Sequence, residues 1–201
     1  CALPIYWPVV VRSATQGLYY VLCGPLDFNH ASVIAVGTNT ARFNGNFNGN
    51  FYTISNYIVT TPGTFDAGGT GLFGVTQGGA IYNVGFVNAT LTTHYAGSVA
   101  GTTYGTAFSN IYSKNVVDTD SDYVGGLFYQ FFEGSSIVDS FVNSDLRIDY
   151  GMDCVGGFAC WVGENTTIAR MRMITKMSYP HDPRGYGDSQ SFISGFAPII
   201  R

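Results

Sequence analysis

Charge is scarce in this sequence, and its scarcity excludes several classes of protein. Only 11% of the 201 residues are charged, and nine Lys and Arg against thirteen Asp and Glu give a formal net charge of −4 at pH 7. So few cations cannot form the basic surface that binds nucleic-acid phosphates, so we predict no nucleic-acid partner. With 46% apolar residues the chain has ample area to bury, which argues against disorder.

Long apolar runs are missing as well. No stretch of 18 or more apolar residues occurs, so the sequence predicts no transmembrane segment. Cys1 stands where an initiator Met would be, so we expect a chain that is processed or a fragment, with any signal peptide already removed. Two glycosylation sequons, at Asn88 and Asn165, add to the prediction of a secreted or cell-surface glycoprotein.

A repeat is what the sequence has in abundance. Large apolar residues recur at steps of 27, 27, 29 and 31 residues, and a second apolar series precedes the last four by nine or ten residues. The first series consists of Ile54, Ile81, Phe108, Ile137 and Ile168. The second consists of Leu72, Val99, Leu127 and Phe158. Two landmarks that keep phase over four units indicate a repeat protein.

Units of this length are compatible with a helical solenoid, a leucine-rich repeat, a propeller blade or a coil of a parallel β-helix. The units lack a helical apolar stripe and are rich in Gly, Asn, Thr and β-branched residues, which excludes helical solenoids. Propeller blades are longer and have four strands each. Short apolar runs between Gly, Asn, Ser and Asp corners favour strands. The sequence therefore predicts an all-β parallel β-helix, or solenoid, of about five to six coils.

An Asn follows the apolar residue of the first series by two positions in three units. These are Asn56, Asn83 and Asn110, and Asp139 takes the same place in the fourth unit. Asn tolerates the left-handed conformation of a tight corner, and its amide can bond the equivalent amide one coil away. We therefore predict a structural corner ladder of these four residues, which Arg170 ends in the last unit.

Three stretches resemble the GLUG-type repeat of bacterial and protist surface proteins. They are residues 43–56, which read FNGNFNGNFYTISN, residues 71–74 with 79–84, and residues 124–128. The resemblance covers about residues 18 to 175, with Asn48 in place of the usual Asp and the usual glycine pair lost at 96–98. It implies a right-handed parallel β-helix in an extracellular adhesin, a protease-associated stalk or another large surface protein.

We expect a single β-helix domain over residues 1–201, with an N-terminal segment and first coil at 1–50, repeat coils at 51–175, and a loop insertion and terminal coil at 176–201. Open coil ends leave unpaired backbone groups, and the apolar residues 2–11 could lie on a neighbouring subunit. We therefore predict an extracellular structural or adhesive protein, not an enzyme and without a cofactor, that associates with copies of itself as a filament subunit. Glycans or a host or cell surface are further predicted partners.

A carbohydrate-binding or polysaccharide-degrading β-helix is the alternative. Such sites need carboxylates that converge on one face. Counted from the first apolar series, Asp66, Asp120 and Asp149 fall twelve residues on and His94 thirteen, which would form one acidic column along an edge. No Lys or Arg shares their phase, which argues against a lyase.

Asp118, Asp120 and Asp122 have the spacing that begins a Ca²⁺ loop, because alternate side chains of a tight loop can point at one cation. The Gly comes late, at Gly125, and no closing Glu follows, so turn chemistry explains the run equally well and we predict no metal site. Residues 179–188, with His181 beside its neighbour Asp, are expected to form an exposed loop or cap.

Four cysteines, Cys1, Cys23, Cys154 and Cys160, are disulfide candidates. If the chain between Cys154 and Cys160 were extended, their Cα atoms would lie about 20 Å apart, well beyond the reach of a disulfide. A bridge between them therefore requires a corner at residues 156–157. Otherwise they pair with the other two, pair with another chain or remain buried thiols, and Cys1 could instead be the acylated first residue of a bacterial lipoprotein.

Overall fold

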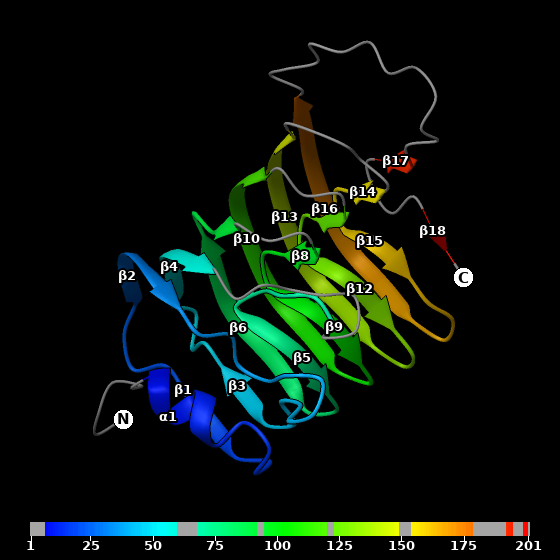
Figure 1. The fold of residues 1–201 in the computed structure, drawn as a ribbon. Helices are drawn as coiled ribbons and strands as arrows, with labels where there is room; N and C mark the ends of the chain where they lie inside the picture. The colour runs from blue at the N-terminus through cyan, green and yellow to red at the C-terminus, as the bar shows by residue number, and fades with distance from the viewer. Residues whose placement is uncertain are drawn as a thin grey trace.

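A computed structural model describes residues 7–59, 68–91, 95–119, 123–148, 154–178, 192–194 and 199–200. The chain winds as a parallel β-solenoid of about five turns (Figure 1). Each complete turn places one long strand and two short strands in three parallel sheets. The predicted all-β parallel solenoid is therefore confirmed.

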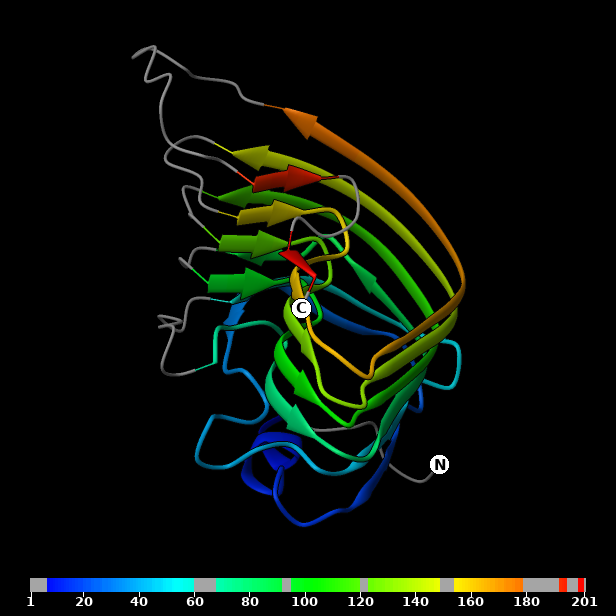
Figure 2. The same ribbon diagram turned by 90° about the vertical axis from the view of Figure 1, so that its right-hand side faces the viewer.

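The three sheets differ in the length of their strands. Sheet A contains β1 (Tyr19–Val21), β2 (Leu26–Val33), β3 (Asn46–Asn48), β4 (Thr53–Val59), β6 (Ala80–Val87), β7 (Thr90–Leu91), β10 (Ala107–Thr119), β13 (Ser136–Ile148) and β16 (Thr167–Ser178). Sheet B contains β5 (Phe73–Gln77), β9 (Ala100–Tyr104), β12 (Phe128–Phe132), β15 (Ala159–Val162) and β18 (Ile199–Ile200). Sheet C contains β8 (Tyr95–Gly97), β11 (Tyr123–Gly125), β14 (Cys154–Gly156) and β17 (Phe192–Ser194). Figure 2 shows the long strands of sheet A curving around one side of the solenoid.

Strand register confirms the phase of the later repeat units. Phe108 of β10 is paired with Ile81 on one side and Ile137 on the other, and Ile137 is paired with Ile168. The second apolar series stacks as well, because each N–H of Val99 and Leu127 donates to the carbonyl one coil further on at 2.9 Å. The fully buried members of this second column are Leu72, Val99, Leu127 and Phe158.

The first coil departs from the predicted phase. Phe47, not Ile54, is paired with Ile81, and Ile54 is paired with Phe86. The chain takes seven residues from Phe47 to Ile54 where the next coil takes five from Ile81 to Phe86. The extra residues form a corner around Asn50, whose φ is 50°. The prediction that Ile54 begins the first apolar column is therefore wrong.

A short helix, α1 (Trp7–Arg12), covers the N-terminal end of the solenoid interior. The Trp7 side chain is only 6% exposed. Its ring packs edge-on against Phe28, Phe47 and Phe73, with centroids 5.7, 6.3 and 6.0 Å away. Of the apolar segment 2–11, Trp7 and Val10 are buried in their own chain, Val9 is exposed, and residues 2–6 lie outside the described residues, so contact with a neighbouring subunit stays a prediction.

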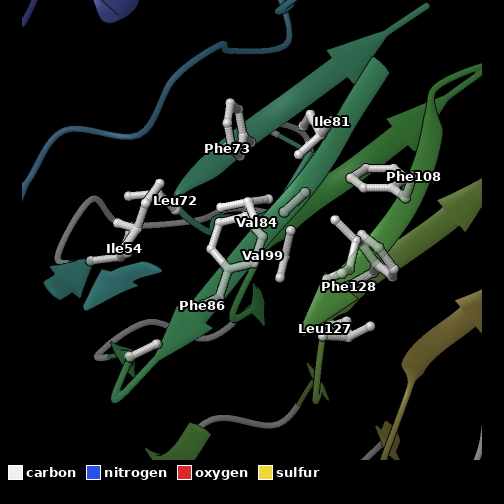
Figure 3. Close-up of a cluster of buried hydrophobic side chains, with 14 of the residues drawn as sticks. Ile54, Leu72, Phe73, Ile81, Val84, Phe86, Val99, Phe108, Leu127 and Phe128 are labelled. Atoms are coloured by element: carbon white, nitrogen blue, oxygen red, sulfur yellow. The ribbon is translucent and has the colours of Figure 1, made fainter. Parts of the chain in front are cut away.

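The interior between the sheets is filled by apolar side chains. Figure 3 shows Phe73 of sheet B and Ile81, Phe86 and Phe108 of sheet A directed into this shared space, and all four are fully buried. Burial of each such side chain stabilises the fold by about 1.5–3 kcal/mol. The packed interior leaves the outer faces, corners and ends as places for a functional site.

Gly125 tests how closely the coils pack at the bend between sheets C and B. A Cβ on Gly125 would lie 1.6 Å from the carbonyl oxygen of Phe128 and 2.8 Å from the Cα of Ala159. We expect Gly125→Ala to lower the free energy of unfolding by about 3 kcal/mol, measured by urea denaturation followed by circular dichroism. Gly24→Ala is the control, because a Cβ there meets no atom within 4 Å. Equal stability losses in the two variants would contradict this packing.

Candidate functional site

One corner of sheet A carries a column of residues in the left-handed conformation. Asn83 and Asn110 have φ angles of 52° and 50°, and Asp139 and Arg170 in the next two coils have 52° and 49°. Asn110 Nδ2 donates to Asn83 Oδ1 at 2.9 Å, and Asn83 Nδ2 donates to Asn48 Oδ1 at 3.4 Å. Short polar side chains tolerate this conformation and can link adjacent corners, so the column fixes the bend of sheet A.

Asn56 belongs to a different column. Its Nδ2 donates to Asp27 Oδ1 at 3.0 Å, and its Oδ1 accepts from Asn88 Nδ2 at 3.1 Å. The register that pairs Ile54 with Phe86 also brings Asn56 beside Asn88. The prediction that Asn56 shares a ladder with Asn83 is therefore wrong, although its φ of 53° shows that it too forms a corner.

Arg170 ends the main column with an ion pair. Its Nη2 donates to Asp139 Oδ2 at 2.8 Å, and its Nε donates to Asp139 Oδ1. Two parallel bonds of this kind give the pair a defined geometry. The hydrogen bond from Arg170 holds the pKa of the Asp139 carboxyl below its ordinary value. Because both side chains are exposed, the pair orients the last corner rather than contributing much stability.

Two of the four cysteines lie at the bend between sheets C and B. Cys154 and Cys160 form a disulfide with their Cα atoms 5.5 Å apart. The chain bends at 157–158, between β14 and β15, and so supplies the corner that this bridge requires. Cys23 is also disulfide-bonded, and Cys1 lies outside the described residues.

Tyr129 is the centre of a second apolar cluster, which packs on the outside of this bend beside the disulfide. Tyr129 is fully buried, with its ring centroid 5.4 Å from Tyr95 and 6.0 Å from Trp161. Burial raises the pKa of the Tyr129 phenol, so the group stays neutral at physiological pH. The short strands of sheets B and C are therefore held by packing on their outer as well as their inner side.

Both predicted glycosylation sites lie at exposed corners. Asn88 and Asn165 have φ angles of 55° and 54° and are exposed. The Asn88 Nδ2 donates a hydrogen bond to Asn56 Oδ1 at 3.1 Å. Glycosylation at the two positions stays a prediction.

The predicted acidic residues are mostly outside the described part of the chain. This applies to Asp66, His94, Asp120, Asp122 and Asp149, and to the insertion 179–188. Asp118 lies on β10, where its backbone is paired with that of Arg147. Within the described ranges no three His, Cys, Asp or Glu lie close enough to hold a metal ion, and no helix there has the length and apolarity to span a membrane.

The outer face of sheet B carries residues that the sequence expectations do not include. Gln77, Tyr104 and Phe132 lie side by side on β5, β9 and β12. Each follows the second apolar series by five residues, and this constant spacing is the signal that could have revealed them. Arg42 and Trp161 lie against this group, with the Arg42 guanidinium carbon 4.6 Å from the Tyr104 ring centre and the Trp161 ring 6.5 Å from that of Phe132.

The chain thus belongs to the class of parallel β-solenoids with polar corner ladders. No protein-family model matches the chain, and no curated protein shows significant similarity to it. A solved structure that resembles it is that of a candidate immunoglobulin A1 protease from Bacteroides ovatus. The two are 15% identical with a TM-score of 0.43, over 95% of this chain and 81% of that one. Membership of the GLUG-type repeat family stays a prediction.

The corner ladder predicts different costs for two substitutions of Asn110. Asn110→Ala removes the hydrogen bond to Asn83 and places Ala, whose side chain has no polar group, at a φ of 50°. We therefore expect the free energy of unfolding to fall by about 2 kcal/mol. Asn110→Gly removes the same hydrogen bond, but Gly adopts this φ without strain, so we expect the free energy of unfolding to fall by only about 1 kcal/mol. Urea denaturation measures both, and a larger cost for Gly than for Ala would contradict the ladder.

The Arg170 pair predicts a measurable change in proton affinity. We expect Arg170→Gln to raise the pKa of Asp139 towards its ordinary value, measured by NMR titration of the side-chain carboxyl. Because the folded pKa of Asp139 is lowered, the stability due to the pair is present above the unfolded pKa and is lost as pH falls through the folded one. Asp27 is the control, since its lowered pKa comes from bonds to Asn29 and Asn56 and should not change. An unchanged Asp139 pKa in the variant would refute the pair.

Proposed function

We propose that this chain is an extracellular structural or adhesive solenoid that associates with a second copy of itself through β16. The observation that carries the proposal is the edge of sheet A. β16 is 12 residues long and pairs with β13, and no other described strand pairs with it. An edge of this length presents backbone N–H and C=O groups that can pair with another chain.

The interior beside β16 is only partly covered. Ile168, Met171 and Met173 pack against the core but remain half-buried. In the preceding strand the residues paired with Ile168 and Met173, namely Ile137 and Val142, are fully buried. A second chain placed against β16 would remove this apolar surface from water, which favours association.

The cations of β16 lie over their own sheet. The Arg172 guanidinium carbon is 5.9 Å from the ring centre of Phe141, and Lys176 Nζ is 3.8 Å from Asp145 Oδ2. Together with the Arg170 pair, these contacts direct the positive charges of β16 towards β13. Charged side chains often protect an exposed edge strand from pairing, but here the three cations are engaged within the chain.

The helix at the N-terminal end of the interior supports a dimer over head-to-tail stacking. α1 covers the N-terminal end of the interior, where Trp7 packs on three aromatic rings. Two copies therefore meet most simply through their β16 edges around a two-fold axis, since such an interface uses the same surface twice. The filament predicted from the sequence would require a second contact surface. The disulfide between Cys154 and Cys160 supports a location in an oxidising compartment.

Light scattering coupled to size-exclusion chromatography tests this proposal. We expect the unmodified chain to have the mass of a dimer and Met173→Lys to have that of a monomer, because the charge would be buried in the interface. Val116→Lys, on the outward face of β10 where the native side chain is 38% exposed, is the matched control and should stay dimeric. A monomeric unmodified chain at high concentration, or a dimer that tolerates Met173→Lys, would overturn the proposal.

A further inference from the structure

A row of aromatic rings and one guanidinium group follows the outer face of sheet B along the solenoid axis. We name Arg42, Tyr104, Phe132 and Trp161 the aromatic row. The Arg42 guanidinium carbon is 4.6 Å from the Tyr104 ring centre, and the Tyr104 and Phe132 rings are 6.2 Å apart. Phe132 and Trp161 follow at 6.5 Å with their planes 24° apart. The three rings come from β9, β12 and β15, which are neighbours in the sheet.

The rings of the row remain partly exposed although the core lies one strand position away. Phe128 and Phe131 of β12 are fully buried, whereas Phe132, like Tyr104 and Trp161, is half-buried. Trp161 also rests on the fully buried Tyr129 at 6.0 Å, beside the disulfide. The row is therefore a rigid apolar surface, which lowers the entropic cost of binding a ligand.

A polar pocket adjoins the Arg42 end of the row. It has a volume of about 370 Å³. Its lining residues carry hydroxyl, amide or guanidinium groups and are Thr15, Asn39, Thr40, Arg42, Asn44 and Gln77. Such groups donate and accept hydrogen bonds in several directions, as a ligand rich in hydroxyl groups requires.

Arg42 is held in this pocket without a carboxylate partner among the described residues. Its Nη1 donates to Gln77 Oε1 at 3.3 Å, its Nη2 to Asn39 Oδ1 at 3.2 Å and its Nε to the Asn39 carbonyl at 3.3 Å. A guanidinium has five N–H donors, so these bonds fix the group and leave two donors over. A fixed guanidinium with remaining donors suits a carboxylate of a ligand.

We infer that the aromatic row and its pocket bind a linear acidic oligosaccharide. A sugar ring has an apolar C–H face that can pack on an aromatic ring and hydroxyl groups that need hydrogen bonds when they are buried. The pocket takes a uronate residue with its carboxylate on Arg42, and the following sugars lie along Tyr104, Phe132 and Trp161. Glu133 and Glu164, exposed at the next corner, place negative charge beyond the rings, so the carboxylate of the ligand lies at the Arg42 end and the sugars along the rings are neutral.

This inference supplies a ligand for the proposed adhesive role and lies on a different sheet from β16. The two can therefore fail separately. Met173→Lys should abolish association and leave oligosaccharide binding unchanged, so light scattering and calorimetry on one sample distinguish the two outcomes.

Isothermal titration calorimetry with a cellotetraose whose terminal sugar is oxidised to glucuronate tests the inference. We expect saturable binding that Arg42→Gln and Trp161→Leu each weaken by about tenfold or more. Tyr112→Ala is the control, because Tyr112 is an aromatic residue that is 42% exposed but lies on sheet A, away from the row. This variant should bind the oligosaccharide with unchanged affinity. Since Trp7 is buried and is the other of the chain's two Trp residues, intrinsic fluorescence of the unmodified chain should report the approach of sugar to Trp161.

Three results would overturn the inference. The first is the absence of saturable binding to the cellotetraose that ends in glucuronate. The second is equal binding of neutral cellotetraose, or of polyglutamate, which carries the charge without the sugar. The third is unchanged affinity in Arg42→Gln, an exposed-pocket substitution that leaves the core intact and so keeps the test independent of folding.

Discussion

Hydrogen-bonded register between successive coils is the constraint on which the rest of the structure depends. Parallel strands lie about 4.8 Å apart, so a residue at a given phase lies directly against its equivalents above and below. The position of a residue within its coil therefore determines whether its side chain lies in the core, at a corner or on the outer face. The column of Ile81, Phe108 and Ile137 faces the core, Asn83 and Asn110 take the corner, and the rings of the aromatic row face outward.

The sequence was sufficient for the columns whose chemistry repeats. Apolar residues that must be buried in every coil leave a periodic signal, and so do Asn residues at a φ that few other side chains tolerate. The first coil was not predictable in this way. Residues 53–56 match the repeat pattern in sequence. In the structure the corner at Asn50 and Phe51 moves them forward, so that residues 53–55 pair with residues 85–87 of the next coil. α1 carries no periodic pattern because a six-residue helix is held by the packing of Trp7 rather than by its own propensity.

The candidate site was less predictable than the fold because its members share a phase but not a chemistry. Gln77, Tyr104 and Phe132 occupy equivalent positions on an outer face where stacking does not restrict residue type. Arg42 joins them only because its side chain reaches across β5, which no spacing rule reveals. The sequence allowed a disulfide between Cys154 and Cys160 only if the chain turns between them, and the structure was needed to show that turn.

The difference between the helix-covered first coil and the half-buried β16 has a mechanical consequence. In a solenoid each coil is stabilised by its immediate neighbours, so local stability follows position along the axis. Trp7 and its aromatic contacts reinforce one end, whereas β16 has its only described strand neighbour on one side. A pulling force would therefore detach β16 more easily than the coil that α1 covers, so the described coils would separate one after another rather than in one cooperative break.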